Sequence, residues 1–215
     1  MKTMIAVPCM DTVPTVFMES MMALMPAGET QVSYTKSSLV YDARNILASK
    51  AINGGYDRIM WLDSDMVFRP DLMLKLAKDM DEGREMVTGI CFKRKPPFTP
   101  TCYKTLEYTE EGNKPVYKLE PYLDYPKDQI FKVAGCGFGV VMMTTELVLK
   151  VAEKFGYPFS PRMGIGEDLS FCWRVNQLGV PIWCDSRIKV GHAGLITVTE
   201  ETYLNTRRGG GDDEG

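Results

Sequence analysis

Two aspartates follow an apolar segment in the first third of the chain. Asp63 and Asp65 come directly after residues 59–62, which read Ile-Met-Trp-Leu. In an open α/β sheet, ligands bind beyond the carboxyl ends of the strands, and carboxylates there suit a hard divalent cation that keeps positions free for phosphate oxygens. Such a cation neutralises a diphosphate and makes it a better leaving group. The pattern therefore predicts a Mn²⁺ or Mg²⁺ site at the end of a buried strand.

A second aspartate pair shows that the spacing alone is a weak signal. Asp79 and Asp81 have the same spacing, but they fall at the end of an expected helix rather than after an apolar strand. We interpret this second pair as a solvated surface. The buried strand before Asp63 and Asp65 is what distinguishes them.

Two further acids, Glu167 and Asp168, open an expected helix late in the chain. The positive end of the helix dipole favours acids in a first turn, so simple capping would explain them. The functional interpretation is that one carboxylate of this pair, kept ionised by that dipole, takes the proton of an acceptor hydroxyl. Residues 157–166, just before the pair, hold two prolines and two glycines and are expected to form a mobile loop.

The only histidine, His192, follows the expected strand Ile188 to Val190 and has Gly191, Ala193 and Gly194 as neighbours. A lone histidine is more often a structural polar residue than a ligand. Small neighbours at a strand end leave room for a phosphate or a metal, and imidazole can join carboxylates as a ligand of manganese-like ions. His192 is therefore a candidate third metal ligand.

The elements that must position these residues alternate along the first half of the chain. Apolar segments and helical spacing predict strands at residues 2–8, 30–34, 57–62 and 85–92, and helices at residues 12–25, 38–53 and 70–80. Strands alternating with helices imply a mainly parallel α/β sheet that is covered on both faces. An antiparallel hairpin at residues 101–119, strands at 130–134 and 138–143, helices at 145–155 and 167–178, and two short strands complete the expected domain.

Composition fits one soluble domain of ordinary size. Of 215 residues, 45% are hydrophobic and 25% charged, and the net charge of -3 favours neither nucleic acid nor an anionic membrane. Residues 1–206 are expected to form the domain and the glycine-rich, acidic residues 207–215 a disordered tail. The longest uncharged stretch, residues 133–145, is shorter than the ~20 residues of a membrane helix. Six cysteines without a C-x-x-C pair favour a reducing, cytoplasmic compartment.

In combination and in order, these motifs resemble those of GT-A glycosyltransferases. The closest likeness is to small family 2-like enzymes, with some resemblance to the mannan-elongating mannosyltransferases. The matching segments are Asp63-Ser64-Asp65 for the metal motif, Ala43-Arg44-Asn45 for the A-R-N element, Gly135-Cys136-Gly137-Phe138-Gly139 for the glycine-rich segment beside the donor sugar, and Glu167-Asp168 for the E-D motif. His192 falls where many GT-A enzymes place a metal ligand.

The resemblance implies a single GT-A domain that moves a sugar from a nucleoside-diphosphate sugar, a UDP-sugar rather than a GDP-sugar, to an acceptor hydroxyl. It implies donor contacts by Val7, Pro8, Arg44, Asp63, Ser64, Asp65, Gly137 and Phe138, metal ligation by Asp65, Asp63 and His192, and catalysis by Asp168 and Glu167. The acceptor stays open between a glycan, a protein, a small molecule and a nucleic acid. The oligomeric state is open as well.

Two other classes share parts of this pattern. A nucleotidyltransferase of sugar phosphates usually has a glycine-rich loop with a basic residue after the first strand, whereas residues 9–12 read Cys-Met-Asp-Thr. A non-catalytic nucleotide-sugar-binding module would need neither the E-D pair nor His192. The basic run Lys93-Arg94-Lys95 is interpreted as a solvated loop, with contact to an anionic acceptor as the alternative.

Overall fold

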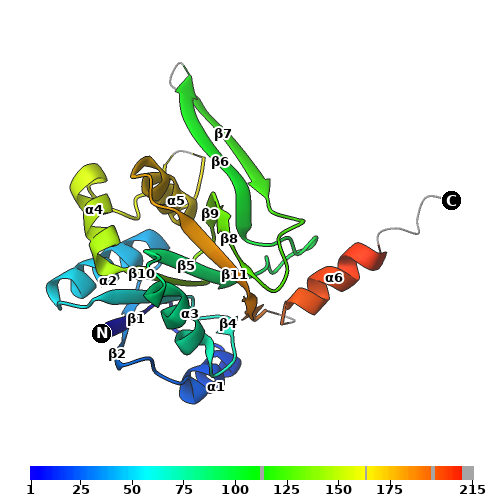
Figure 1. Cartoon of the computed structure of the whole chain (residues 1–215), viewed down its shortest axis with the longest axis horizontal. Coiled ribbons are helices and arrows are strands. Elements are labelled where there is room, and N and C mark those ends of the chain that lie inside the picture. Colours follow the sequence, from blue (N-terminus) through cyan, green and yellow to red (C-terminus); the bar gives the residue numbers. More distant parts are fainter. Residues whose placement is uncertain (112–113, 163, 195–196, 210–215) are drawn as a thin grey trace.

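The computed structural model describes residues 1–111, 114–162, 164–194 and 197–209 (Figure 1). The first half contains β1 (Lys2–Cys9), α1 (Thr15–Ala23), β2 (Glu29–Lys36), α2 (Val40–Asn53), β3 (Arg58–Leu62), β4 (Met66–Val67), α3 (Leu72–Asp81) and β5 (Met86–Ile90). The second half contains β6 (Cys102–Glu111), β7 (Lys114–Pro121), β8 (Ile130–Val133), β9 (Gly135–Cys136), β10 (Val140–Thr144), α4 (Thr145–Phe155), α5 (Glu167–Gln177), β11 (Ile182–Lys189), β12 (Gly191–His192) and α6 (Glu200–Gly209).

The central sheet has seven strands in the order β2-β1-β3-β10-β5-β11-β8. Strands β2, β1, β3, β5 and β11 run in one direction, and β10 and β8 run in the other. The predicted mainly parallel α/β domain is therefore confirmed. The two-residue strands β4 and β9 were not predicted.

Helices cover both faces of this sheet, which explains why its central strands β3, β10 and β5 are buried along almost their whole length. In β1, Met4 and Ala6 pack into the cluster that includes Leu47 of α2. Their neighbours Ile5 and Val7 pack into a second cluster with residues of α1 and α3. The alternation follows from the two-residue period of a strand.

A long antiparallel hairpin projects from the body of the molecule (Figure 1). Strands β6 and β7 pair from Tyr103 opposite Pro121 to Glu111 opposite Lys114, and β9 pairs with the base of β6. The hairpin predicted at residues 101–119 is confirmed. Helix α4 likewise begins where expected, because the Thr144 side chain accepts a hydrogen bond from the Leu147 N–H at 3.1 Å.

Helix α6 corrects part of the expected tail. It extends through Gly209, so residues 207–209 are helical rather than disordered. The remainder of the expected tail, residues 210–215, lies outside the described residues. Among the described residues, none of the helices is long and apolar enough to cross a membrane.

The interpretation of Asp79 as a solvated residue was wrong. Only 3% of Asp79 is exposed, because it shares the inner face of α3 with Leu72 and Leu76. Its carboxylate lies 3.4 Å from Arg187 Nη2, and Arg187 Nε also donates to Asp185 at 2.8 Å. Burial and the neighbouring Asp185 carboxyl group raise the pKa of Asp79 to about 6. Asp79 and Asp185 therefore form a buried acidic pair, and Arg187 of β11 balances part of its charge.

Candidate functional site

A cleft of about 470 Å³ opens at the carboxyl ends of β1 and β3. Eight of the residues expected at the site line it: Pro8, Arg44, Asp63, Ser64, Asp65, Glu167, Asp168 and His192. Seven more were not predicted: Cys9, Met10, Ser37, Ser38, Val40, Ala43 and Arg94. Residues from both ends of the sequence thus meet at one edge of the sheet, as the strand-end argument requires.

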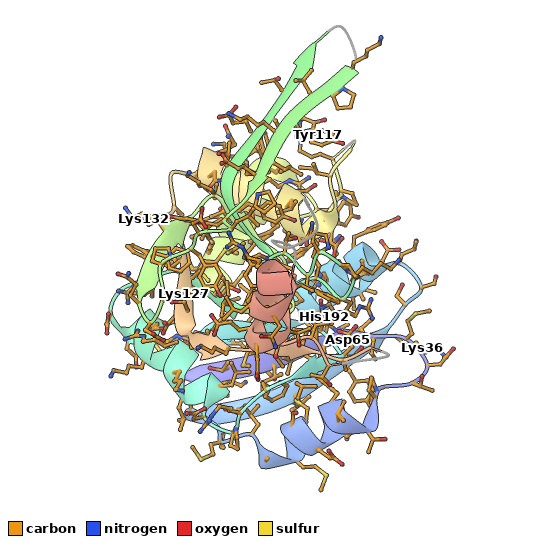
Figure 2. All side chains as sticks on the ribbon, turned by 90° about the vertical axis from the view of Figure 1, so that its right-hand side faces the viewer. Lys36, Asp65, Tyr117, Lys127, Lys132 and His192 are labelled. Atoms are coloured by element: carbon orange, nitrogen blue, oxygen red, sulfur yellow. The ribbon has the colours of Figure 1, made fainter. Side chains whose placement is uncertain are left out.

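Backbone pairing explains how His192 reaches the aspartates. Strand β12 pairs with β4, so that His192 lies opposite Met66. The Ala193 N–H donates to Asp65 O at 2.7 Å, and the Asp63 N–H donates to Gly139 O at 3.0 Å. These bonds hold the β3–β4 loop between the residue after β12 and the residue before β10. Figure 2 shows Asp65 and His192 side by side.

Asp65 and His192 form one side of the cleft. Asp65 Oδ2 lies 3.3 Å from His192 Nε2 and 2.9 Å from Arg94 Nη1. The other ring nitrogen, Nδ1, is 3.0 Å from Phe92 O, a carbonyl that only accepts, so Nδ1 carries a hydrogen. Burial alone would raise the pKa of Asp65, but the hydrogen bond and charge of His192 and the charge of Arg94 lower it.

The donor atoms of this pair fit a divalent cation. Two ligands at about 2.1 Å from an octahedral ion lie about 3 Å apart, close to the separation of Asp65 Oδ2 and His192 Nε2. With Nδ1 donating to a carbonyl, loss of the Nε2 proton to an incoming cation would leave a lone pair directed towards the site, the arrangement of metal-binding histidines. The structure therefore provides two candidate protein ligands, and phosphate or water oxygens would have to supply the others.

The predicted three-residue metal set is not assembled. Among the described residues, no group of three or more His, Cys, Asp or Glu side chains is placed to hold a metal ion. Asp63 instead accepts from Arg44 Nη2 at 2.8 Å. Burial raises the pKa of Asp63 and the charge of Asp65 raises it further, although Arg44 opposes the shift. The role that the structure gives Asp63 is thus to pair with Arg44.

Arg44 lies in the interior rather than at the surface. Only 2% of its side chain is exposed, and Nε donates to Glu167 at 3.3 Å while Nη2 bonds Asp63. Its guanidinium also lies 5.2 Å from the centre of the Phe138 ring. Burial alone would lower the pKa of Arg44, but the carboxylates around it raise it. Arg44 therefore links the loop after β3 to the first turn of α5.

Asp168 lies next to Glu167 on the other side of the cleft. Its Oδ1 accepts from the Leu169 N–H at 2.7 Å. Its Oδ2 faces Gly137, where an added Cβ would lie 3.7 Å away. Burial and the charge of Glu167 raise the pKa of Asp168 to about 6. The helix-dipole argument predicted the opposite direction. It failed because desolvation outweighs the dipole, yet at pH 7 the carboxyl group is still largely ionised.

Three of the expected donor residues lie outside the cleft lining. Val7 is buried beneath the sheet against α1, and Phe138 is buried against Trp61 and Phe171. Gly137 lies near Asp168 but donates its N–H to Thr101 O at 2.8 Å. Phe138 therefore supports the packing around Arg44. Val7, although almost fully buried, lines a separate pocket with Phe17 of α1.

The loop before α5 is fixed at several points. Phe159 is fully buried, and its N–H donates to Asn45 Oδ1 at 3.0 Å. Arg174 Nη2 donates to Ser160 O at 2.7 Å. These contacts oppose mobility at Phe159 and Ser160. The expectation that the segment 157–166 is mobile stays a prediction.

Comparisons with known proteins agree with the fold. No protein-family model matches the chain, and no curated protein matches it. Among solved structures, the chain is similar to A197 from STIV, with a TM-score of 0.66 and 19% identity over 94% of this chain and 92% of A197. It is also similar to GalNAc-T7, solved with UDP, GalNAc and Mn²⁺, with a TM-score of 0.61 and 11% identity over 96% of this chain.

The chain spans 47% of the length of GalNAc-T7, about half of that protein. At such low identities the similarity shows the fold alone. These two matches support the GT-A part of the resemblance but not the narrower likeness to family 2 enzymes or to mannosyltransferases. The chain therefore has a GT-A-like fold, built as a single Rossmann-like α/β domain.

Proposed function

We propose that this chain is a metal-assisted glycosyltransferase that takes its sugar from a nucleoside-diphosphate sugar. The observation that carries the proposal is the composition of a single cleft. The pair Asp65–His192, which fits a divalent cation, lines the same cleft as Glu167 and Asp168, where a base is needed. A UDP-sugar is the favoured donor, because GalNAc-T7, with the same fold, was solved with UDP and Mn²⁺.

The donor would extend along the carboxyl edge of the sheet. Asp65 and His192 would hold Mn²⁺ or Mg²⁺, which when bound supplies positive charge to the diphosphate leaving group. The nucleoside would then lie towards Pro8, Ser37 and Ser38, at the other end of the cleft lining. The serine hydroxyl groups can donate and accept hydrogen bonds there.

Asp168 is the proposed general base. The acceptor oxygen forms a bond to the anomeric carbon while the bond from that carbon to the diphosphate oxygen breaks. The hydroxyl proton passes to the Asp168 carboxylate, and the electron pair of the broken bond leaves with the diphosphate. A pKa of about 6 suits this role, because the group is mostly ionised at pH 7 and still basic enough to accept a proton.

Arg44 and Glu167 position the groups around the reaction. Arg44 is too deeply buried to act mainly as a surface cation, and it fixes the carboxylates of Asp63 and Glu167 relative to each other. Glu167 keeps an oxygen beyond the one bonded to Arg44, with which it can accept from a sugar hydroxyl. This arrangement predicts that donor and base sites respond together to changes at Arg44.

The test is the release of free nucleoside diphosphate from a panel of UDP- and GDP-sugars with Mn²⁺. We expect slow metal-dependent release of UDP by the wild type, and its loss in Asp65→Asn and His192→Ala. The control is Asp124→Asn, because Asp124 is a highly exposed aspartate paired only with Arg207 among the described residues. Release of pyrophosphate from nucleotide and sugar phosphate would instead identify a nucleotidyltransferase, and tight binding without turnover a binding module.

A further inference from the structure

One carboxylate oxygen of the cleft has two partners. Arg94 Nη1 lies 2.9 Å from Asp65 Oδ2, and His192 Nε2 lies 3.3 Å from the same oxygen. Asp65 Oδ2 is also the oxygen that, together with His192, fits a divalent cation. An arginine side chain therefore already contacts the oxygen that would bind that cation.

Arginine and a divalent cation compete for this oxygen. A guanidinium group carries only donors and cannot itself be a metal ligand. Its positive charge, held within hydrogen-bond distance of Asp65, would lie only a few ångströms from a cation bound to the same oxygen, and like charges at that range repel strongly in a partly desolvated site. The contact seen here and a metal bound at Asp65 thus oppose each other.

The backbone around Arg94 is fixed, whereas its side chain can move. The Lys93 N–H donates to Thr99 O at 3.0 Å, and the Thr101 N–H donates to Cys91 O at 2.9 Å. The Arg94 side chain itself is 53% exposed, so solvent surrounds one side of it. Displaced from Asp65, it stays tethered at the cleft lining.

A diphosphate would give the displaced guanidinium a new partner. When a nucleoside diphosphate enters with a cation, its oxygens bring negative charge next to Asp65, and the planar fork of arginine bonds two phosphate oxygens at once. Arg94 would therefore lose one anion and gain another in the same step.

We infer that Arg94 is a built-in counter-ion that covers Asp65 in the empty site and moves to the donor diphosphate when the cation binds. This inference rests on the proposed function. Its consequence is cooperative binding: a divalent cation binds weakly by itself and much better with the nucleotide, because only the nucleotide offers Arg94 a replacement for Asp65.

The experiment measures binding rather than turnover. Mn²⁺ alone, and UDP at saturating Mn²⁺, are titrated calorimetrically into the wild type, Arg94→Gln, Arg94→Lys and Lys93→Gln, with melting curves to confirm folding. Lys93→Gln is the matched control, since it removes the same charge from the exposed neighbouring position.

Arg94→Gln should change the two affinities in opposite directions. We expect Mn²⁺ alone to bind about two- to fivefold more tightly, the range for releasing a partly exposed ion pair, and UDP with Mn²⁺ to bind about tenfold more weakly, the lower end for hydrogen bonds to charged groups. Arg94→Lys should fall between wild type and Arg94→Gln, because it keeps the charge without the fork. Lys93→Gln should change neither affinity.

Asp65→Asn separates the two ways in which the inference can fail. If wild-type Mn²⁺–UDP binding depends on Asp65 but Arg94→Gln leaves both affinities unchanged, or shifts them in the same direction, the counter-ion role is wrong and the proposed function stands. If the folded wild type binds neither Mn²⁺ nor UDP, or Asp65→Asn binds them as the wild type does, the metal site itself is wrong and the inference fails with it.

Discussion

Asp168→Asn changes one group and should affect folding and reaction in opposite ways. Asparagine keeps the size of the side chain and can still accept from the Leu169 N–H through its Oδ1. It removes an ionisation that burial and Glu167 make unfavourable, since they raise the pKa from 3.8 to about 6. That difference is equivalent to about 3 kcal/mol at most, and we expect roughly 1–2 kcal/mol because solvent reaches the residue from the cleft.

The sign of the stability change depends on pH. The folded-state pKa is raised, so the stabilising contribution of Asp168 is fully present below about pH 4 and is lost as the pH rises through about 6. The free energy of unfolding of Asp168→Asn, minus that of the wild type, should therefore be about 1–2 kcal/mol larger at pH 7.5 than at pH 4. Urea denaturation of both proteins at the two pH values measures this difference.

The reaction should respond in the other direction. Without the base, donor hydrolysis or transfer should fall by about 10²- to 10⁴-fold, with UDP affinity near that of the wild type. In the wild type, kcat/KM should decline as the pH falls below about 6, and this limb should be absent in the variant. The anomer of the product is determined alongside, since in a retaining reaction the leaving phosphate can accept the proton. Turnover within a few-fold of wild type, or a stability difference of the opposite sign, would refute the reasoning.

Three further predictions concern other parts of the structure. Arg44→Met should lower the unfolding free energy by about 2–4 kcal/mol, somewhat less than for a fully buried pair because Asp63 and Glu167 are partly exposed, and should weaken UDP binding; unchanged urea midpoints and calorimetric affinity would contradict it. Asp79→Asn should stabilise the protein at pH 7.5 relative to pH 4, because the raised pKa of Asp79 makes its stabilising contribution disappear as the pH rises through about 6; melting temperatures at the two pH values check the sign. Amide exchange at Phe159 should be slow with or without Mn²⁺–UDP, while residues 164–166 become protected only when both are bound; identical exchange in the two states would rule out closure.

That Asp65 and His192 lie side by side could be foreseen from the sequence, because both follow predicted strands and strand ends meet at one edge of a parallel sheet. The pairing of Arg44 with Asp63 could not be foreseen in this way. Helical spacing places Arg44 beside the apolar residues of α2, but nothing local indicates that Asp63 takes up one of its nitrogens. Arg94 was missed as a partner of Asp65 for a related reason, since a long side chain from an irregular loop has no periodicity that points to its contact.

The error at Asp79 has a different origin. A charged residue near the end of a helix is usually solvated, but this position has the same helical phase as Leu72 and Leu76. The groups that make burial tolerable, Asp185 and Arg187, come from β11, far along the chain. The helical spacing of α3 places Asp79 on the buried face, but its charge argues against burial. Only the tertiary contacts with Asp185 and Arg187 explain why a charged residue lies there.

The pairing of β12 with β4 also sets when the site can exist during synthesis. Asp65 emerges from the ribosome well before His192, because 126 residues lie between them in the chain. Strand β11, which lies between β5 and the edge strand β8, also emerges long after Asp65. A nascent chain therefore carries Asp65 long before β4 can pair with β12, and pairings so distant in sequence form slowly. A chain cut short before His192 would lack the imidazole and the β12 partner of β4, so on the proposed function it should not hold the cation.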